Sequence, residues 1–402
     1  MHEEDQLPND AKRRGIVPGA DQSANVRKVY DMVPACQPAN GGGTAGPLVI
    51  AHYVTWYQTP ACSGSWGFWQ VNRPTIPREA WHFPETRDGR GWRDIASVFH
   101  PVIGPYDSSD PHACEYHILL AKLAGLDAFV CDWYGFEPTP EHPRDHPGFM
   151  TLLRAAELLD FRVGLCWEDR SLFQHRPAVS RAGAIRRGRD ILRRLEREVF
   201  TSPAYLRMDA RPVLMNFAWD PPGQGPADTT LFAHEWDHIL GEAHRRPLFI
   251  HDYQSHHPAP EFEAYESVAP WGSCLHERAD VPEFWPRAYA ARGRGRFSFL
   301  SGTVRPGFDN RGSGGWGHGL AVDPRGDGSR YRTIWQNVLR HPVRFVQVAT
   351  WNDFNEGGTI EPTRPGIAHP GLGVEGYGYR ELETTQQFSA RLRGGRADPA
   401  PL

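Results

Sequence analysis

Apolar runs alternate with helical patterns along this chain from Leu48 onward. The predicted strands are 48–57, 128–134, 162–167, 212–217, 247–253, 267–271, 297–304 and 345–350. The predicted helices are 109–125, 148–159, 182–199, 229–245, 281–292, 330–340 and 381–393. Several of the strands are continuously apolar, as expected of parallel strands that are buried on both faces. The alternating order therefore predicts an α/β fold, a (β/α)8 TIM barrel in a single domain.

An open, doubly wound parallel sheet is the alternative architecture. A nucleotide-binding sheet of that kind would carry G-x-G-x-x-G or G-x-x-x-x-G-K-[ST] directly after its first strand. Neither motif occurs there, and the glycine run at 41–43 precedes the strand instead of following it. The sequence therefore favours the barrel.

Residues 1–46 are polar and include this glycine run, so they are predicted to be a poorly ordered tail ahead of a barrel domain at 47–402. The first residues lack the apolar stretch of a signal peptide, and no segment reaches the 18 or so apolar residues of a transmembrane helix. We therefore expect a cytoplasmic protein, or a secreted one if a signal has been trimmed.

Charge and composition narrow the classes of ligand. The chain has 44 basic and 48 acidic residues, a near balance that gives no basic surface for nucleic acid or anionic membrane. Its 14 tryptophans suit either a large core or a sugar-binding cleft, because a sugar ring presents apolar C–H surface to aromatic rings. The six cysteines form no C-x-x-C pair, and the histidine-rich segment 251–257 does not by itself show converging ligands. No metal or cofactor is expected.

Acidic and aromatic residues gather where the predicted strands end. The carboxyl ends of the strands form the active face of a barrel, so residues there are candidates for substrate binding. They are Tyr53, Trp56 and Tyr57 from the first strand, Asp132 and Trp133 from the second, Glu168 from the third, Asp252 and Tyr253 from the fifth, Arg305 from the seventh, and Trp351, Asn352 and Glu361 after the eighth. For Glu361, anchoring of the loop is as good an interpretation as substrate contact.

The last strand carries the strongest signal. It runs directly into a loop with two carboxylates three residues apart, Asp353 and Glu356. Cleavage of a glycosidic bond generally uses two carboxyl groups, one that donates a proton to the leaving oxygen and one that acts as nucleophile or base. Two carboxylates in one site also push their pKa values apart, so that one stays protonated near neutrality. We therefore predict that both point into one pocket and act as the catalytic pair.

The same loop, W-N-D-F-N-E-G-G-T-I-E-P at 351–362, resembles the last-strand motif of glycoside hydrolase family 99, the endo-α-mannosidase and endo-α-mannanase family. The segments H-Y-V-T-W-Y at 52–57 and G-P-Y-D-S-S-D-P at 104–111 resemble its first strand and the approach to its first helix, and 302–309 resembles a further segment loosely. Glu168 falls where the family has a substrate-binding glutamate. An aspartate at 353 is shared with the similar motif of the family 71 α-1,3-glucanases.

The resemblance implies a glycoside hydrolase without cofactor that acts on an α-linked oligosaccharide or glycoconjugate and retains configuration through a 1,2-anhydro sugar. Asp353 would take the proton from the sugar O2, and Glu356 would protonate the leaving oxygen and later activate water. The family has a glutamate at position 353 and a histidine at position 355, where this chain has Asn355. The shorter aspartate withdraws the carboxylate by roughly 1.5 Å, about one C–C bond, so the sugar and the linkage stay open.

Two other functions remain as alternatives. A non-catalytic carbohydrate-binding barrel would keep its affinity for sugar after substitution of Glu356, whereas a hydrolase would lose turnover. An intracellular tailoring enzyme that acts on a sugar-containing metabolite would fit the missing signal sequence. The oligomeric state is left open.

Overall fold

The computed structural model describes residues 46–139, 141–173, 179–218, 231–252, 267–269, 281–295, 297–369 and 372–394. All of them fall within one compact unit, Cys36–Leu402. The predicted tail, apart from residue 46, lies outside the described residues.

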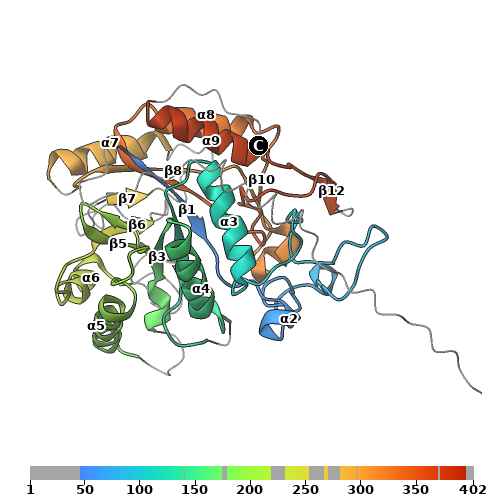
Figure 1. Ribbon diagram of the computed structural model, residues 1–402, viewed down its shortest axis with the longest axis horizontal. Coiled ribbons are helices and arrows are strands. Elements are labelled where there is room, and N and C mark those ends of the chain that lie inside the picture. Colours follow the sequence, from blue (N-terminus) through green and yellow to red (C-terminus); the bar gives the residue numbers. More distant parts are fainter. Residues whose placement is uncertain are drawn as a thin grey trace, which may run out of the picture. The chain divides into compact units, whose positions relative to one another are not determined.

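Within the described part of the chain, eight strands run parallel in one sheet (Figure 1). They are β1 (Leu48–Tyr53), β2 (Ala128–Trp133), β3 (Arg162–Glu168), β5 (Arg211–Phe217), β6 (Leu248–Asp252), β7 (Ser267–Ala269), β8 (Leu300–Val304) and β11 (Val343–Val348). Their order in the sheet is β7-β6-β5-β3-β2-β1-β11-β8, and the two end strands, β7 and β8, contact each other. The short β4 (Arg207–Met208) adds to β5 in antiparallel orientation. This is the strand order of the predicted (β/α)8 barrel, which confirms the fold class.

Seven helices follow the strands at the predicted places in the described chain. They are α3 (Pro111–Leu123), α4 (Asp145–Leu158), α5 (Arg181–Glu198), α6 (Ala233–Leu240), α7 (Val281–Gly293), α8 (Ser329–Val338) and α9 (Arg380–Leu392). Local signals explain the start of α3. The Asp110 side chain accepts a hydrogen bond from the backbone N–H of His112 at 2.9 Å, and Pro111 occupies the first helical position. Among the described helices, none has the length and hydrophobicity that crossing a membrane requires.

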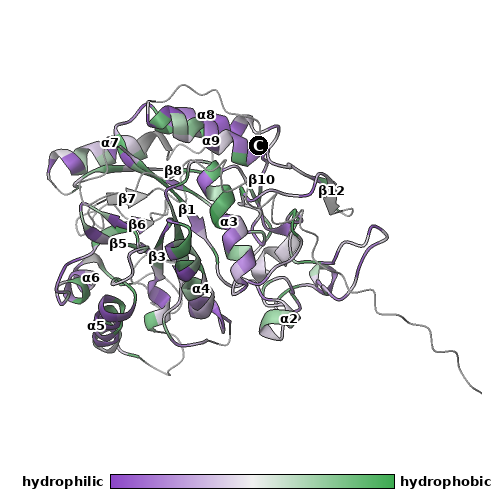
Figure 2. Cartoon of the chain, viewed as in Figure 1, coloured by the Kyte–Doolittle hydropathy of each residue, from purple (hydrophilic) through white to green (hydrophobic). Residues whose placement is uncertain are grey.

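Successive residues along β1, β2 and β11 alternate between two cores. Ile50, Val130 and Phe345 belong to the cluster enclosed by the strands, whereas Val49 and Phe129 belong to the cluster between strands and helices. This follows from the period of two in side-chain direction along a strand. In Figure 2 the hydrophobic residues lie mainly on the central strands, whereas α5 is largely hydrophilic.

Four excursions from the barrel, each joining a strand to the next helix, carry the remaining elements. The segment between β1 and α3 holds α2 (Pro60–Ser63) and a 3-10 turn at Arg78–Ala80, and another 3-10 turn, Asp169–Leu172, follows β3. The segment between β8 and α8 holds β9 (Phe308–Asp309), a 3-10 region at Asn310–Gly317 and β10 (Val322–Asp323), and a hairpin of β12 (Gly366–His369) and β13 (Val374–Gly376) follows β11.

The first strand is shorter than predicted, because β1 ends at Tyr53 instead of Tyr57. Directly after Tyr53, the backbone of Val54 pairs with the side chain of Asn352 instead of with a strand. The Asn352 Oδ1 accepts from Val54 N at 2.8 Å, and its Nδ2 donates to Val54 O at 3.0 Å. A side chain thus replaces the neighbouring strand, and the loop after β11 is joined to the end of β1.

Candidate active site

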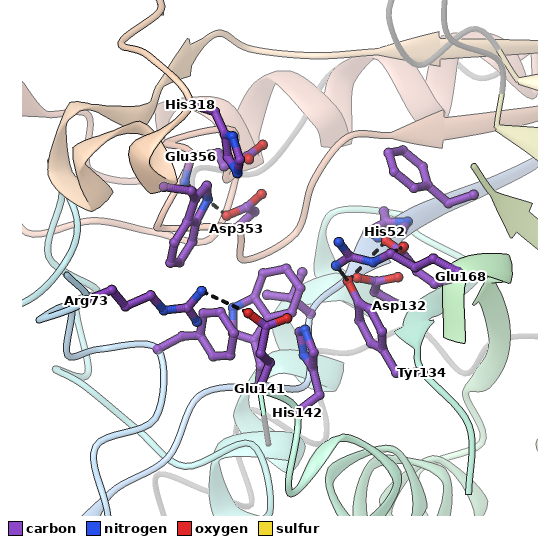
Figure 3. Close-up of a pocket in the computed structure, with 16 residues that line it drawn as sticks. His52, Arg73, Asp132, Tyr134, Glu141, His142, Glu168, His318, Asp353 and Glu356 are labelled. Carbon is purple, nitrogen blue, oxygen red and sulfur yellow. Dashed lines mark hydrogen bonds and ion pairs between the residues drawn. The ribbon is translucent and has the colours of Figure 1, made fainter. Parts of the chain in front are cut away.

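A cavity of about 170 Å³ opens at the carboxyl ends of β1, β2, β3 and β11 (Figure 3). It is lined by His52, Val54, Trp56, Phe68, Arg73, Asp132, Tyr134, Glu141, His142, Glu168, Arg170, Phe217, Trp316, His318, Asp353 and Glu356. Five of the predicted site residues are among them: Trp56, Asp132, Glu168, Asp353 and Glu356. They come from four different strand ends, so the barrel brings them together as the strand-end pattern predicted.

The loop after β11 holds Asp353 and Glu356 in a fixed turn. The Asp353 N–H donates to the Thr350 hydroxyl at 2.9 Å, and one Asp353 carboxylate oxygen accepts from the Glu356 N–H at 3.0 Å. Gly357 comes next with φ +61°, and a Cβ at this position would lie 2.9 Å from the backbone oxygen of Asp309. Only glycine fits this positive φ and close approach without strain, so the turn that presents the two acids depends on it.

Burial raises the pKa values of both acids, and the charge of Glu356 adds to the rise at Asp353. For Asp353, burial first and the charge of Glu356 second raise the pKa to about 8. Burial also raises the pKa of Glu356, while the positive charge of Arg305 and a hydrogen bond from the Trp316 side chain oppose that rise. The two carboxylates therefore share a proton near neutral pH.

The protonation of Asp353 and Glu356 in the free pocket differs in part from the prediction. Glu356 has the raised pKa expected of a proton donor, but Asp353, expected to be ionised, is the acid that holds the proton in the free pocket. The cause is a difference in the charges that act on the two acids. Arg305 is the main group that favours the ionised form of Glu356, whereas Glu356 is the main charge that opposes ionisation of Asp353.

The wall opposite this pair is polar (Figure 3). The Tyr134 hydroxyl donates to Glu168 at 3.1 Å and accepts from Arg170 at 2.9 Å, and the Arg170 Nε lies 3.1 Å from the other Glu168 oxygen. Asp132 is only 5% exposed, and its Oδ1 has no hydrogen-bond partner among the described residues. Burial and then the charge of Glu168 raise the pKa of Asp132 well above its ordinary range. This wall therefore offers fixed donors and acceptors to a polar ligand.

Aromatic rings form the outer part of the pocket. The Trp56 indole donates to the Asn355 side chain at 3.2 Å and lies 5.0 Å from the ring of Phe68. The ring centroid of Trp316 lies 5.4 Å from that of Phe68. Such a surface suits the apolar face of a sugar ring.

Two predicted residues lie behind the pocket wall because the strand-end rule missed the facing of neighbouring residues. Tyr53 is fully buried, and its hydroxyl pairs with Nδ1 of His117 at 2.8 Å, whereas its neighbour His52 lines the pocket. Trp133 packs against Trp167 in the outer core, whereas its neighbour Asp132 lines the pocket. Since adjacent strand residues face opposite sides, the roles of Tyr53 and Trp133 are corrected from substrate contact to packing.

Tyr57, Trp351 and Asn352 also support the site from behind instead of lining it. Tyr57 stacks on Trp69 with ring centroids 3.9 Å apart, and its hydroxyl accepts from the Phe354 N–H at 2.9 Å. Trp351 is fully buried in the core between strands and helices, and Asn352 is occupied with the backbone of β1's continuation. We correct their predicted role to that of shaping the catalytic loop.

Glu361 and Arg305 are buried rather than exposed to a ligand. Glu361 accepts from the Tyr106 hydroxyl at 2.8 Å and lies 3.4 Å from Nε2 of His117, so the loop-anchoring interpretation replaces substrate contact. Arg305 is 1% exposed and acts on the pocket through its charge: burial first and the charge of Arg305 second lower the pKa of His52 to about 3. The side chain of Asp252, the last residue of β6, and all of Tyr253 lie outside the described residues.

Several pocket residues were not predicted. His52, Tyr134 and Arg170 adjoin predicted residues in sequence, so the period of two along β1 and the continuation of β2 and β3 could have indicated them. The others come largely from the excursions between strands and helices, where no periodic pattern gives a position. They are Val54, Phe68, Arg73, Glu141, His142, Phe217, Trp316 and His318.

Among the described residues, no group of three or more histidine, cysteine, aspartate or glutamate side chains is placed to hold a metal ion.

Comparison with known proteins gives the relationships of the chain. A model of glycosyl hydrolase family 99 matches residues 45–219. The glycoprotein endo-α-1,2-mannosidase of Rattus norvegicus is 32% identical over 99 residues, 24% of this chain, and a glycoprotein endo-α-1,2-mannosidase-like protein of Danio rerio is 34% identical over 92 residues, 22% of this chain. Over residues 45–219 this chain is therefore similar to glycoside hydrolase family 99. The matches span only 21% of the length of each of these two relatives.

Solved structures extend the likeness in fold beyond residues 45–219. The GH99 endo-α-mannosidase of Bacteroides thetaiotaomicron has a TM-score of 0.64 and 16% sequence identity, covering 86% of this chain and 97% of that one. A glycoside hydrolase-like protein has a TM-score of 0.53 and 12% identity, covering 90% and 98%. At these identities the likeness shows a common fold.

Proposed function

We propose that this family 99-like protein is a glycoside hydrolase that cleaves an α-linked glycan or sugar conjugate with Asp353 and Glu356 as its reacting pair. The observation that carries the proposal is the placement of two coupled carboxylates on one short loop in a buried pocket. Glycosidic cleavage requires two acids of this kind in one site, since one acid donates a proton while the other takes one.

In the first step, Asp353 takes the proton of the sugar O2 hydroxyl, and O2 forms a bond to C1. The bond between C1 and the leaving oxygen breaks, and Glu356 gives its proton to that oxygen. In the second step, Glu356 takes a proton from water, the water oxygen bonds to C1, and O2 leaves C1 and recovers its proton from Asp353. Two displacements at C1 retain the configuration of the sugar.

The free pocket must change its protonation before this sequence begins, because the shared proton is on Asp353. A sugar hydroxyl that donates to Asp353 favours its ionised form, and the proton then resides on Glu356. Binding of the substrate therefore prepares the reactive form of the pair.

The pocket size points to one enclosed sugar ring. Its volume of about 170 Å³ is below the roughly 300–1,000 Å³ of sites that enclose drug-sized ligands. The polar wall of Asp132, Glu168 and Arg170 would bind the hydroxyls of this ring, and the aromatic outer part would contact the next unit of the glycan or conjugate.

A hydrolysis assay tests the proposal. The wild-type protein is incubated with α-linked disaccharides of mannose and of glucose and with the matching α-glycosyl fluorides, and products are measured by proton NMR. The control is the double variant with Asp353→Asn and Glu356→Gln. We expect hydrolysis of at least one substrate by the wild type alone. Sugar binding without turnover in the wild type would replace the proposal by a non-catalytic carbohydrate-binding barrel.

Asp132 is predicted to act as a neutral hydrogen-bonding group. Its raised pKa keeps it protonated near neutral pH, so Asp132→Asn, which preserves shape and neutrality, should keep kcat/KM within about threefold, whereas Asp132→Ala, which removes the hydrogen bonds, should lower it by roughly tenfold or more. The measurement is kcat/KM at pH 6–7 on the best substrate of the assay. Equal losses in both variants would show that the charge of Asp132 is what matters.

A further inference from the structure

The excursion between β8 and α8 contacts the catalytic loop at three successive points. The Asp309 N–H donates to the backbone oxygen of Glu356 at 2.7 Å. The Nη2 of Arg325 donates to two backbone oxygens, that of Gly357 at 2.6 Å and that of Thr359 at 2.5 Å. The backbone at Glu356 and just beyond it is therefore tied to this single excursion.

Arg325 is held rigidly where it makes these contacts. Its side chain is 7% exposed, and its guanidinium carbon lies 4.9 Å from the ring centroid of Phe99 and 4.3 Å from that of Tyr377. The Tyr377 hydroxyl donates to Thr359 O at 2.9 Å, so this hydroxyl and the Arg325 guanidinium donate to the same carbonyl oxygen. Glu381 lies 3.7 Å away and partly offsets the buried charge.

Trp316 reaches the same acid through its side chain. It lines the pocket beside Glu356, and its side chain forms a hydrogen bond with the Glu356 carboxylate. Its backbone has φ +54°, in line with 62° and 59° at Gly314 and Gly315. A left-handed conformation is disfavoured for a bulky residue, and such conformations concentrate at functional sites. The tryptophan is thus held in an unfavourable conformation that brings its ring to the acid.

We propose that Arg325 and Trp316 are positioning residues for Glu356: Arg325 fixes the backbone that carries the acid, and Trp316 fixes its carboxylate. This inference rests on the proposed function, in which Glu356 donates the proton to the leaving group. Proton transfer needs heavy-atom distances of about 2.6–3.2 Å, and a misplacement of about 1 Å costs on the order of a hundredfold in rate. Loss of either residue should therefore affect protonation of the leaving group before it affects binding.

The decisive variant is Trp316→Phe, which keeps a ring and removes the indole N–H. It is compared with the wild type on two substrates, a disaccharide that the wild type hydrolyses and the α-glycosyl fluoride of the same sugar, whose leaving group needs little protonation. We expect kcat/KM to fall about tenfold or more on the disaccharide and less than about threefold on the fluoride. Because a hydrogen bond to the ionised form lowers a pKa, the alkaline limb of the disaccharide profile should move to higher pH.

Arg325 is tested with Arg325→Met and Arg325→Lys on the same two substrates. Lysine keeps a charged N–H donor, so it should recover part of the disaccharide activity that methionine loses, with little change in KM. The matched controls are Trp92→Phe, at a ring outside the pocket, and Arg344→Met, at a surface arginine paired with Asp209 at 2.9 Å. Both controls should retain wild-type rates.

The outcomes separate this inference from the proposed function. Equal losses on both substrates in Trp316→Phe, with an unmoved pH limb, would overturn the positioning role while leaving the glycosidase assignment intact. A folding defect in Arg325→Met does not protect the proposal, since Trp316→Phe decides it alone. A wild type that cleaves neither substrate would overturn the proposed function and this inference together.

Discussion

Replacing Glu356 by glutamine is expected to lower kcat/KM by roughly 10²–10⁴-fold on glycosides with poor leaving groups. Glutamine fills the same space but cannot give a proton to the departing oxygen. On an α-glycosyl fluoride or an activated aryl glycoside the loss should be much smaller, because little protonation is needed in the first step. The measurement is kcat/KM for both substrate types with the wild type and the variant.

The matched comparison is Asp353→Asn. Since Asp353 assists through O2 whatever the leaving group, this variant should lose activity on both substrate types alike. If Glu356→Gln and Asp353→Asn both hydrolysed a verified substrate at the wild-type rate, the chemistry would lie elsewhere in the pocket. The opposite wall, with Asp132 and Glu168, would then be the next place to search.

Stability should depend on pH through Asp353, even without a substrate. Its pKa is about 8 in the folded protein, above the ordinary value of 3.8, so the folded state holds a proton that the unfolded chain has released. The contribution of Asp353 to stability is therefore fully present below about pH 4 and is lost as the pH rises toward 8, by up to about 1.4 kcal/mol per pH unit. Asp353→Asn removes this penalty. We expect the variant to gain stability over the wild type by roughly 2–4 kcal/mol between pH 5 and pH 8.

Urea unfolding at pH 5, 6, 7 and 8 measures this difference. The control is Asp209→Asn at the surface, where the hydrogen bond from Arg344 lowers the pKa of the aspartate; it should not reproduce the gain at high pH. Parallel stability profiles for the wild type and Asp353→Asn would show that Asp353 is ionised in the free pocket. The role expected from the family resemblance would then hold without any shift of the shared proton on binding.

The positions of strands and helices could be predicted because each is a local pattern, a continuous apolar run or a helical repeat bounded by residues such as Asp110. The side of the strand on which a single side chain lies is harder to predict. Tyr53 and Trp133 are candidates because they lie at predicted strand ends, but the period of two places their neighbours His52 and Asp132 in the pocket. Residue type alone does not give the side of the strand on which a side chain lies.

The excursions could not be placed from sequence, because their positions depend on contacts with distant segments. A Cβ at Gly312 would lie within 2.6 Å of backbone atoms of Ser97 and Val98, so the chain around Trp316 is fixed by a close approach between parts of the sequence more than 200 residues apart. The protonation of Asp353 depends in the same way on burial and on the charge of Glu356. These are properties of the assembled pocket and leave no local mark in the sequence.

The most direct test of the central claim is a crystal structure of the Glu356→Gln variant with a bound disaccharide from the hydrolysis assay. The account predicts that the sugar O2 lies within about 2.6–3.2 Å of a carboxylate oxygen of Asp353 and that the glycosidic oxygen lies at a similar distance from the side chain of residue 356. A disaccharide bound with its glycosidic oxygen beyond reach of residue 356, or with O2 facing away from Asp353, would contradict the account.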